Sequence, residues 1–201
     1  MFERILIAKL NWGRFYQGKE LEARFRDPHD VGDDYERFNF RRTTADGRFY
    51  GSIPKKAPTD DGEWLVVFIA HDQSGCYRPV GWYVDAVFEP EGRDRPEYAY
   101  DSSMPSSKYG RFRYRLSADK AYVIPPALRN HFVVPAVANE KMKNATYVFA
   151  RKPSLNEPWR EELARFAEQI ASGQFSSQPS TFNPVNMPGE PLSETVLRER
   201  G

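Results

Sequence analysis

Cysteine and histidine are scarce in this chain of 201 residues, which has one cysteine and three histidines. A single cysteine, Cys76, excludes an internal disulfide, and this fits a reducing cytosol. The histidines His29, His71 and His131 are scattered, so no cluster has the spacing of zinc ligands. We therefore expect a cytoplasmic protein with no metal and no cofactor.

Long apolar runs and familiar enzyme motifs are also missing. The first residues, MFERILIAKLNW, carry charges inside a short apolar run, so they do not resemble a signal peptide, and no segment approaches the length of a membrane span. No GxSxG, HExxH, P-loop or helix-opening GxGxxG motif is present. We predict no catalytic residues and no enzyme activity. The alternative is a hydrolase of nucleic acid that uses His71 and Asp72, although this dipeptide at a strand end is more typical of a hairpin turn.

Aromatic residues, by contrast, make up 14% of the chain. Most are expected to fill the core, because these side chains bury large areas. The surplus leaves room for a site on which a flat ligand stacks.

Positive charge is concentrated in residues 108–152, although the net charge of the chain is only +1. This segment holds ten basic residues against two acidic ones, Asp119 and Glu140, while residues 27–36 are rich in acid. The basic residues could line a groove for phosphates, or they could pair with acids across the fold. Both interpretations stay open. For the first, the predicted phosphate contacts are Lys108, Arg111, Arg113, Arg115, Arg129, Lys141 and Lys143.

Short β-strand patterns run through most of the chain. Residues 64–70, WLVVFIA, form a continuous apolar run that predicts a strand buried on both faces, paired across the 71–78 loop with a strand at 79–88. Asp46-Gly47 predicts a hairpin turn between segments 38–40 and 49–53. Further strands are predicted at 2–10, 112–116, 122–124 and 145–150, and one helical turn at 127–132.

One longer helix is predicted after Asn156, its expected N-cap, with Pro158 in the first turn and Gly173 as the stop. Its apolar stripe consists of Trp159, Leu163, Phe166, Ala167 and Ile170. We predict an α+β fold: a small curved, mainly antiparallel sheet or open barrel with a C-terminal amphipathic helix. Residues 1–173 would form one binding domain, and residues 174–201 a flexible linker or tail.

Five residues have the character of a base-binding pocket. Trp82 and Tyr83 are neighbours on one strand and must point to opposite faces, so one of them should leave the core or line a cavity. Trp12 and Tyr16 lie in a glycine-flanked loop, and Asn39 is an amide between two phenylalanines. A nucleic-acid base needs flat apolar walls and a few fixed hydrogen-bonding groups. The alternative is that each aromatic belongs to the core.

Several short segments resemble the N-terminal, modification-sensing module of bacterial HNH-type (type IV-like) restriction endonucleases. The segments are Asn11-Trp12 with Tyr16-Gln17-Gly18, Phe38-Asn39-Phe40, Tyr50-Gly51, 66–70, Val80-Gly81-Trp82-Tyr83 with Ala86, 121–125 with Arg129 and Pro135, and 144–150. Such modules are similar to the EVE, YTH and PUA-like group of small barrels that hold a flipped or modified base. The resemblance implies that Trp12, Asn39, Trp82 and Tyr83 line the pocket.

The resemblance implies a reader of a modified DNA base in a restriction or phage-defence system. The paired histidines and asparagine of an HNH nuclease are missing from the chain, so we expect an effector nuclease to act in trans or to lie beyond the C-terminus. The expected partner is a modified duplex, with RNA as an alternative ligand and no membrane. The competing hypothesis is a protein-interaction or assembly subunit that does not bind nucleic acid.

Overall fold

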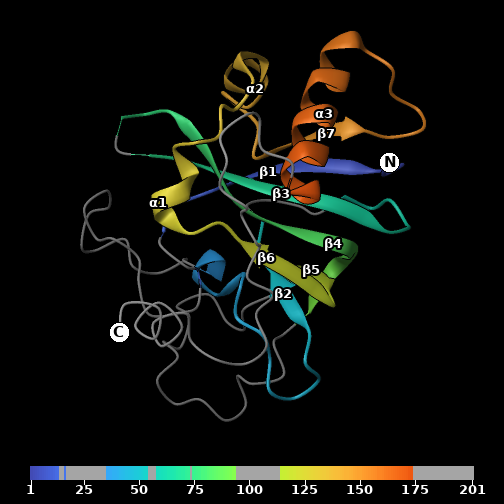
Figure 1. Cartoon of the computed structure of the whole chain (residues 1–201). Helices are drawn as coiled ribbons and strands as arrows, with labels where there is room; N and C mark the ends of the chain where they lie inside the picture. The colour runs from blue at the N-terminus through green and yellow to red at the C-terminus, as the bar shows by residue number, and fades with distance from the viewer. Residues whose placement is uncertain (14–15, 17–34, 54–57, 73, 94–113, 174–201) are drawn as a thin grey trace.

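The computed structural model describes residues 1–13, 16, 35–53, 58–72, 74–93 and 114–173. Its elements are shown in Figure 1. The strands are β1 (Ile5–Leu10), β2 (Phe49–Gly51), β3 (Trp64–His71), β4 (Tyr77–Arg93), β5 (Tyr114–Ala118), β6 (Lys120–Val123) and β7 (Tyr147–Arg151). The helices are the 3-10 helix η3 (Tyr35–Phe38) and the α-helices α1 (Pro126–Arg129), α2 (Ala136–Lys141) and α3 (Pro158–Ser172). The predicted tail, residues 174–201, lies outside the described residues.

The strands form one open sheet in the order β2-β5-β4-β3-β1-β7, and β6 also pairs with β4. Only β1 and β3 are parallel, so the fold is α+β with a mostly antiparallel sheet. The long strand β4 pairs first with β6 and then with β5, and the register against β3 shifts near Asp85, whose φ is +55°. A bulge of this kind bends a strand, which allows the sheet to curve.

The predicted hairpin of β3 and β4 is confirmed, with Val67 opposite Trp82. All residues of 64–70 are buried, as their continuous apolar pattern predicts. Pro79 is tolerated within β4 because it lies at the second register shift, where the ladder of hydrogen bonds is interrupted. No helix in the described part of the chain is long and apolar enough to cross a lipid bilayer.

The sheet has a core on each face. In the helix-side core, α3 packs on β7 and β1 (Figure 1) and buries Leu163, Phe166 and Ile170 on this face of the sheet. Glu157 rather than Asn156 occupies the N-cap of α3, and Gly173 ends the helix in the left-handed conformation with φ +67°. On the other face, which we call the inner core, aromatic side chains from the curved sheet pack with residues 38–40.

The predicted strand at 38–40 is wrong, and one helix was not predicted. Residues 38–40 are not a strand: Phe38 ends η3, and Asn39 and Phe40 form the turn that follows, in which the amides of Asn39 and Arg41 donate to the carbonyls of Glu36 and Phe38. The amide of Phe40 donates instead to the carbonyl of Tyr16, and an isolated bridge between Arg42 and Phe49 continues toward β2. The predicted turn at Asp46-Gly47 does form, with φ +72° at Gly47. Helix α2 has no counterpart among the predicted elements.

Candidate functional site

Four of the five predicted pocket residues meet at the end of β1 in the inner core. Tyr16, Asn39 and Tyr83 are buried, whereas Trp12 is half-buried and packs against the same cluster. The ring of Phe40 connects them, because its centroid lies 5.9 Å from that of Tyr16 and 5.5 Å from that of Tyr83. Trp12 is therefore the member of this group that is placed to meet a ligand.

The side chain of Asn39 has a structural role in this cluster. Its side-chain Nδ2 donates to the carbonyl of Ser52 at 2.9 Å, and its Oδ1 accepts from the amide of Ser52 at 2.8 Å. The hydroxyl of Tyr83 donates to the backbone carbonyl of Asn39. This paired amide holds the 38–40 turn against the chain that follows β2. Because Asn39 is fully buried, the prediction that it contacts a base edge is not met in this conformation.

A second set of hydrogen bonds fixes the chain on either side of Trp12. Oε2 of the buried Glu36 accepts from the backbone amide of Asn11 at 2.7 Å and from its Nδ2 at 3.0 Å. The hydroxyl of Tyr16 donates to the carbonyl of Asn11 at 2.5 Å, and the amide of Phe40 donates to the carbonyl of Tyr16. Sequence reasoning missed Asn11 and Glu36. The sequence does contain a signal for Glu36, because this acidic residue lies very close to the aromatic residues Phe38 and Phe40.

Arg129 lies against Trp12 and is completely buried. Its Nε donates to the carbonyl of Ile124 at 2.9 Å, and its Nη1 donates to the carbonyl of Gly13 at 2.6 Å. Its Cζ lies 5.1 Å from the ring centroid of Trp12 and 5.9 Å from that of Tyr16. Both distances are typical of cation–π contacts. The prediction that Arg129 binds phosphate is wrong for this conformation, because its guanidinium does not reach the surface.

Trp82 is the predicted pocket residue that lies elsewhere. It points into the helix-side core and stacks on Tyr122, with ring centroids 5.0 Å apart and an angle of 19° between the planes. Tyr83 points into the inner core, so the two neighbours do occupy opposite faces. The prediction that one of them leaves the core is wrong, because both faces of the sheet are covered and both side chains are buried.

The predicted phosphate contacts are dispersed. Lys108, Arg111 and Arg113 lie outside the described residues. Nη1 of Arg115 donates to the carbonyl of Pro90 at 2.8 Å. Lys141 pairs with Glu140 at 2.8 Å and also lies over the ring of Trp159, and Lys143 is exposed.

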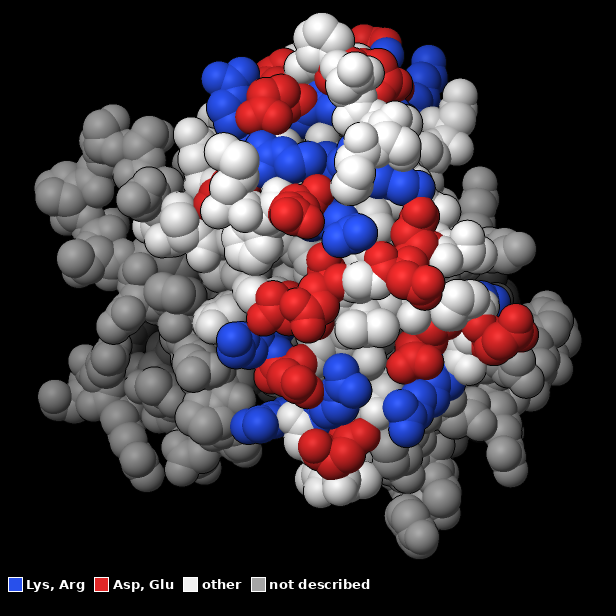
Figure 2. Space-filling view, turned by 90° about the vertical axis from the view of Figure 1, so that its right-hand side faces the viewer, with Lys and Arg blue, Asp and Glu red and all other residues white. Residues whose placement is uncertain are grey.

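Other cations of the basic segment pair with acids from distant parts of the chain. Arg151 bridges to Glu161 and Glu168 on α3, Lys120 pairs with Asp85, and Lys152 pairs with Asp60. Figure 2 shows acidic and basic side chains interleaved over the side of the molecule that lies to the right in Figure 1. For these described residues the pairing interpretation of the charge pattern is the better one.

His71 and Asp72 form a structural turn at the end of β3. Oδ1 of Asp72 accepts from the amides of Ser74 and Cys76, and its Oδ2 accepts from Nε of Arg78 at 2.9 Å. The ring of His71 lies against that of Tyr77 at 3.9 Å. Within the described residues, no group of three or more His, Cys, Asp or Glu side chains is arranged to hold a metal ion. This turn carries hydrogen bonds that stabilise the hairpin.

The Asp72 turn gives a testable pH dependence. Burial raises the pKa of the Asp72 carboxyl, but the hydrogen bonds from Ser74 and Arg78 outweigh burial and hold the pKa at about 2, below its ordinary value of 3.8. The stabilisation is therefore present above pH 3.8 and is lost as the pH falls toward 2. We expect Asp72→Asn to lower the free energy of unfolding by about 1 kcal/mol at pH 7, and the difference from wild type to shrink below pH 4.

Urea unfolding at pH 7, 4 and 2 measures this difference. Asp119→Asn serves as the control, because the Asp119 side chain is 77% exposed and its ion pair with Arg48 should contribute little at any pH. If Asp72→Asn is less stable than wild type by the same amount from pH 7 to pH 2, the stabilising role of the Asp72 carboxylate is contradicted.

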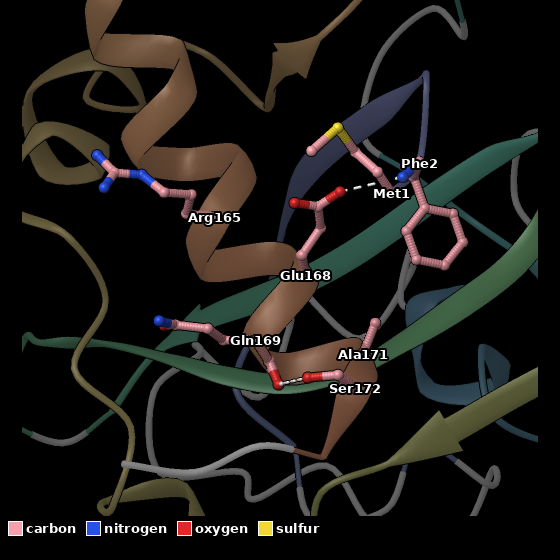
Figure 3. Close-up of a pocket in the computed structure, with 7 residues that line it drawn as sticks. All are labelled: Met1, Phe2, Arg165, Glu168, Gln169, Ala171 and Ser172. Atoms are coloured by element: carbon pink, nitrogen blue, oxygen red, sulfur yellow. Dashed lines mark hydrogen bonds between the residues drawn. The ribbon is translucent and has the colours of Figure 1, made fainter.

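The described residues also line an open hollow of about 440 Å³ at the opposite end of β1 from Trp12. It lies between the N-terminal residues Met1 and Phe2 and the second half of α3 (Figure 3). Glu168 faces it, but its Oε1 already accepts from the amide of Phe2 at 3.0 Å and from Arg151 at 2.7 Å. The carboxylate of Glu168 is thus engaged within the protein.

Comparison with family models, with curated proteins and with solved structures finds no match for this chain.

Proposed function

We propose that this chain is a nucleic-acid-binding module of PUA/EVE-like character that recognises a modified, flipped DNA base, as the reader of a restriction or defence system. The observation that carries the proposal is the placement of Trp12. A half-buried indole is held at the end of β1 among buried aromatic residues, with its chain fixed by Glu36 and its ring against Arg129. This is a rigid, flat apolar surface.

Such a surface suits a base because stacking needs a planar partner that does not move. Stacking on one aromatic side chain is worth roughly 1–3 kcal/mol per base. Flipping costs least for a damaged or modified base, which supplies part of the selectivity. The buried ring of Tyr16 supports this surface from within the core, since its centroid also lies within 6 Å of the guanidinium carbon of Arg129.

Phosphate contacts would position the duplex, while the base contact specifies it. Among the described phosphate-contact candidates, Lys143 is exposed, so it is the best one for this role. Each phosphate that is neutralised makes binding weaker at higher salt. A dissociation constant that is the same at low and physiological salt would count against this part of the proposal.

Fluorescence anisotropy with labelled duplexes tests the function. One sequence is prepared unmodified, with modified cytosine and with methylated adenine, and titrated with wild type, Trp12→Ala and Trp159→Ala. Trp159 is the matched control because it is also half-buried and also lies against a cation, with Cζ of Arg160 4.2 Å from its ring centroid. We expect tight binding to one modified duplex, weakened roughly 5- to 150-fold by Trp12→Ala alone.

Two results would contradict the proposal. If both tryptophan variants bind as wild type does, Trp12 is not the stacking surface. If wild type binds none of the duplexes, the hypothesis of a protein-interaction subunit takes precedence.

A further inference from the structure

Arg129 connects two segments that are far apart in the sequence. It is the last residue of the four-residue helix α1, and its Nε donates to the carbonyl of Ile124, which lies just before that helix. Its Nη1 donates to the carbonyl of Gly13, 116 positions earlier in the chain and directly after Trp12. The guanidinium therefore joins the β6–α1 connection to the chain that carries the proposed stacking residue.

We propose that Arg129 is a positioning residue for the base-binding site: it fixes the height and tilt of the Trp12 ring and does not contact the nucleic acid. The inference rests on the proposed function of Trp12. Arg129 holds the residue after Trp12 by a hydrogen bond and the ring itself by a cation–π contact, at 2.6 Å and 5.1 Å respectively. Two contacts in different directions restrict the indole more than either contact alone.

Only arginine fits this place. Its planar fork directs several N–H donors at fixed angles, whereas the ammonium of lysine is a compact, strongly hydrated charge. Burial lowers the pKa of Arg129 to about 10, and the nearby Tyr16 acts in the opposite direction. The side chain thus stays charged at neutral pH, although no part of it is exposed. A buried charge is tolerated where hydrogen bonds and aromatic faces replace water.

The positioning role makes a different prediction from a phosphate contact. A phosphate contact lowers affinity uniformly across sequences and reduces the slope of log Kd against log salt by about one when it is removed. A positioning residue changes the ability of the site to discriminate between modified and unmodified bases and leaves the slope as it was.

The experiment compares wild type with Arg129→Lys, with Arg129→Gln, which removes the charge, and with Arg151→Lys as the control. Arg151 is half-buried elsewhere and likewise donates to a backbone carbonyl, that of Phe2, at 2.9 Å. The duplexes are those described above, at three salt concentrations, and circular dichroism checks the fold. We expect Arg129→Lys to bind the preferred modified duplex about tenfold more weakly, with reduced selectivity and altered indole fluorescence. We expect the salt slope of Arg129→Gln to equal that of wild type, although the charge is removed. Arg151→Lys should retain the affinity and selectivity of wild type.

Unchanged affinity and selectivity in a folded Arg129→Lys, or a salt slope lower by about one in Arg129→Gln, would overturn the inference while leaving the proposed function in place. A wild type that binds no modified duplex would overturn the proposed function, and this inference with it. If Arg129→Lys does not fold, solvent exchange of the Arg129 Nε–H group is measured by NMR in wild type instead. It should be protected from solvent exchange both with and without the duplex. Fast exchange in the free protein that slows on binding would overturn the positioning role.

Discussion

Replacing Trp82 by alanine should lower the free energy of unfolding by about 3–5 kcal/mol. The indole is 1% exposed and fills the helix-side core between the sheet and the helices. Alanine would remove the stack on Tyr122 and leave a cavity that the surrounding strands can close only in part. The indole Nε1 has no hydrogen-bond partner among the described residues, so Trp82→Phe should cost much less than Trp82→Ala.

Urea unfolding followed by circular dichroism measures this loss. Trp159→Ala is the control, since the Trp159 ring is only half-buried and should contribute less. If Trp82→Ala unfolded at the same urea concentration as wild type, Trp82 would not be a core residue, and its place in a ligand pocket would have to be considered again.

Gly81→Ala is expected to destabilise the protein by about 3 kcal/mol, the upper end for overpacking a core. A Cβ at this position would lie 2.3 Å from the carbonyl oxygen of Tyr122 and 2.5 Å from Cζ of Phe40. The first neighbour is the backbone of β6, which pairs with β4 and cannot move freely. The second is the ring that joins Tyr16 to Tyr83, so the strain reaches the candidate site.

Gly75→Ala provides a matched control for Gly81→Ala. No heavy atom lies within 4 Å of a Cβ at position 75, so only its φ of +78° should matter, at a cost of about 1 kcal/mol. Chemical denaturation of both variants gives the comparison. Equal losses of stability in the two variants would show that glycine is required at position 81 for its backbone conformation and not for the close approach of Phe40.

The sequence alone predicted the parts of the fold whose pattern is local. The run 64–70 is apolar throughout because both faces of β3 are buried, and the apolar spacing of 159–170 follows the face of α3 that packs on the sheet. Residues 38–40 have the same apolar character but form a turn, because the amide of Asn39 pairs with Ser52. That pairing depends on a residue 13 positions away, which a local pattern does not contain.

The candidate site could be predicted only in part, because it too depends on residues that lie far apart in the sequence. Alternation along a strand correctly separates Trp82 from Tyr83, but it does not tell which face another layer covers, and here both are covered. Arg129 was counted as a surface charge because arginine is usually exposed. Its burial depends on the carbonyls of Gly13 and Ile124, which only the folded chain brings together.

The most direct test of the account is which tryptophan a modified base touches. The chain has four tryptophans, so an NMR spectrum of the indole N–H groups contains few signals, and each can be assigned by substitution. On addition of a duplex with one modified base, we predict that the Trp12 signal shifts strongly while the signal of Trp82, buried beneath the helices, does not. A shift of the Trp82 signal with Trp12 unchanged would contradict the proposed site.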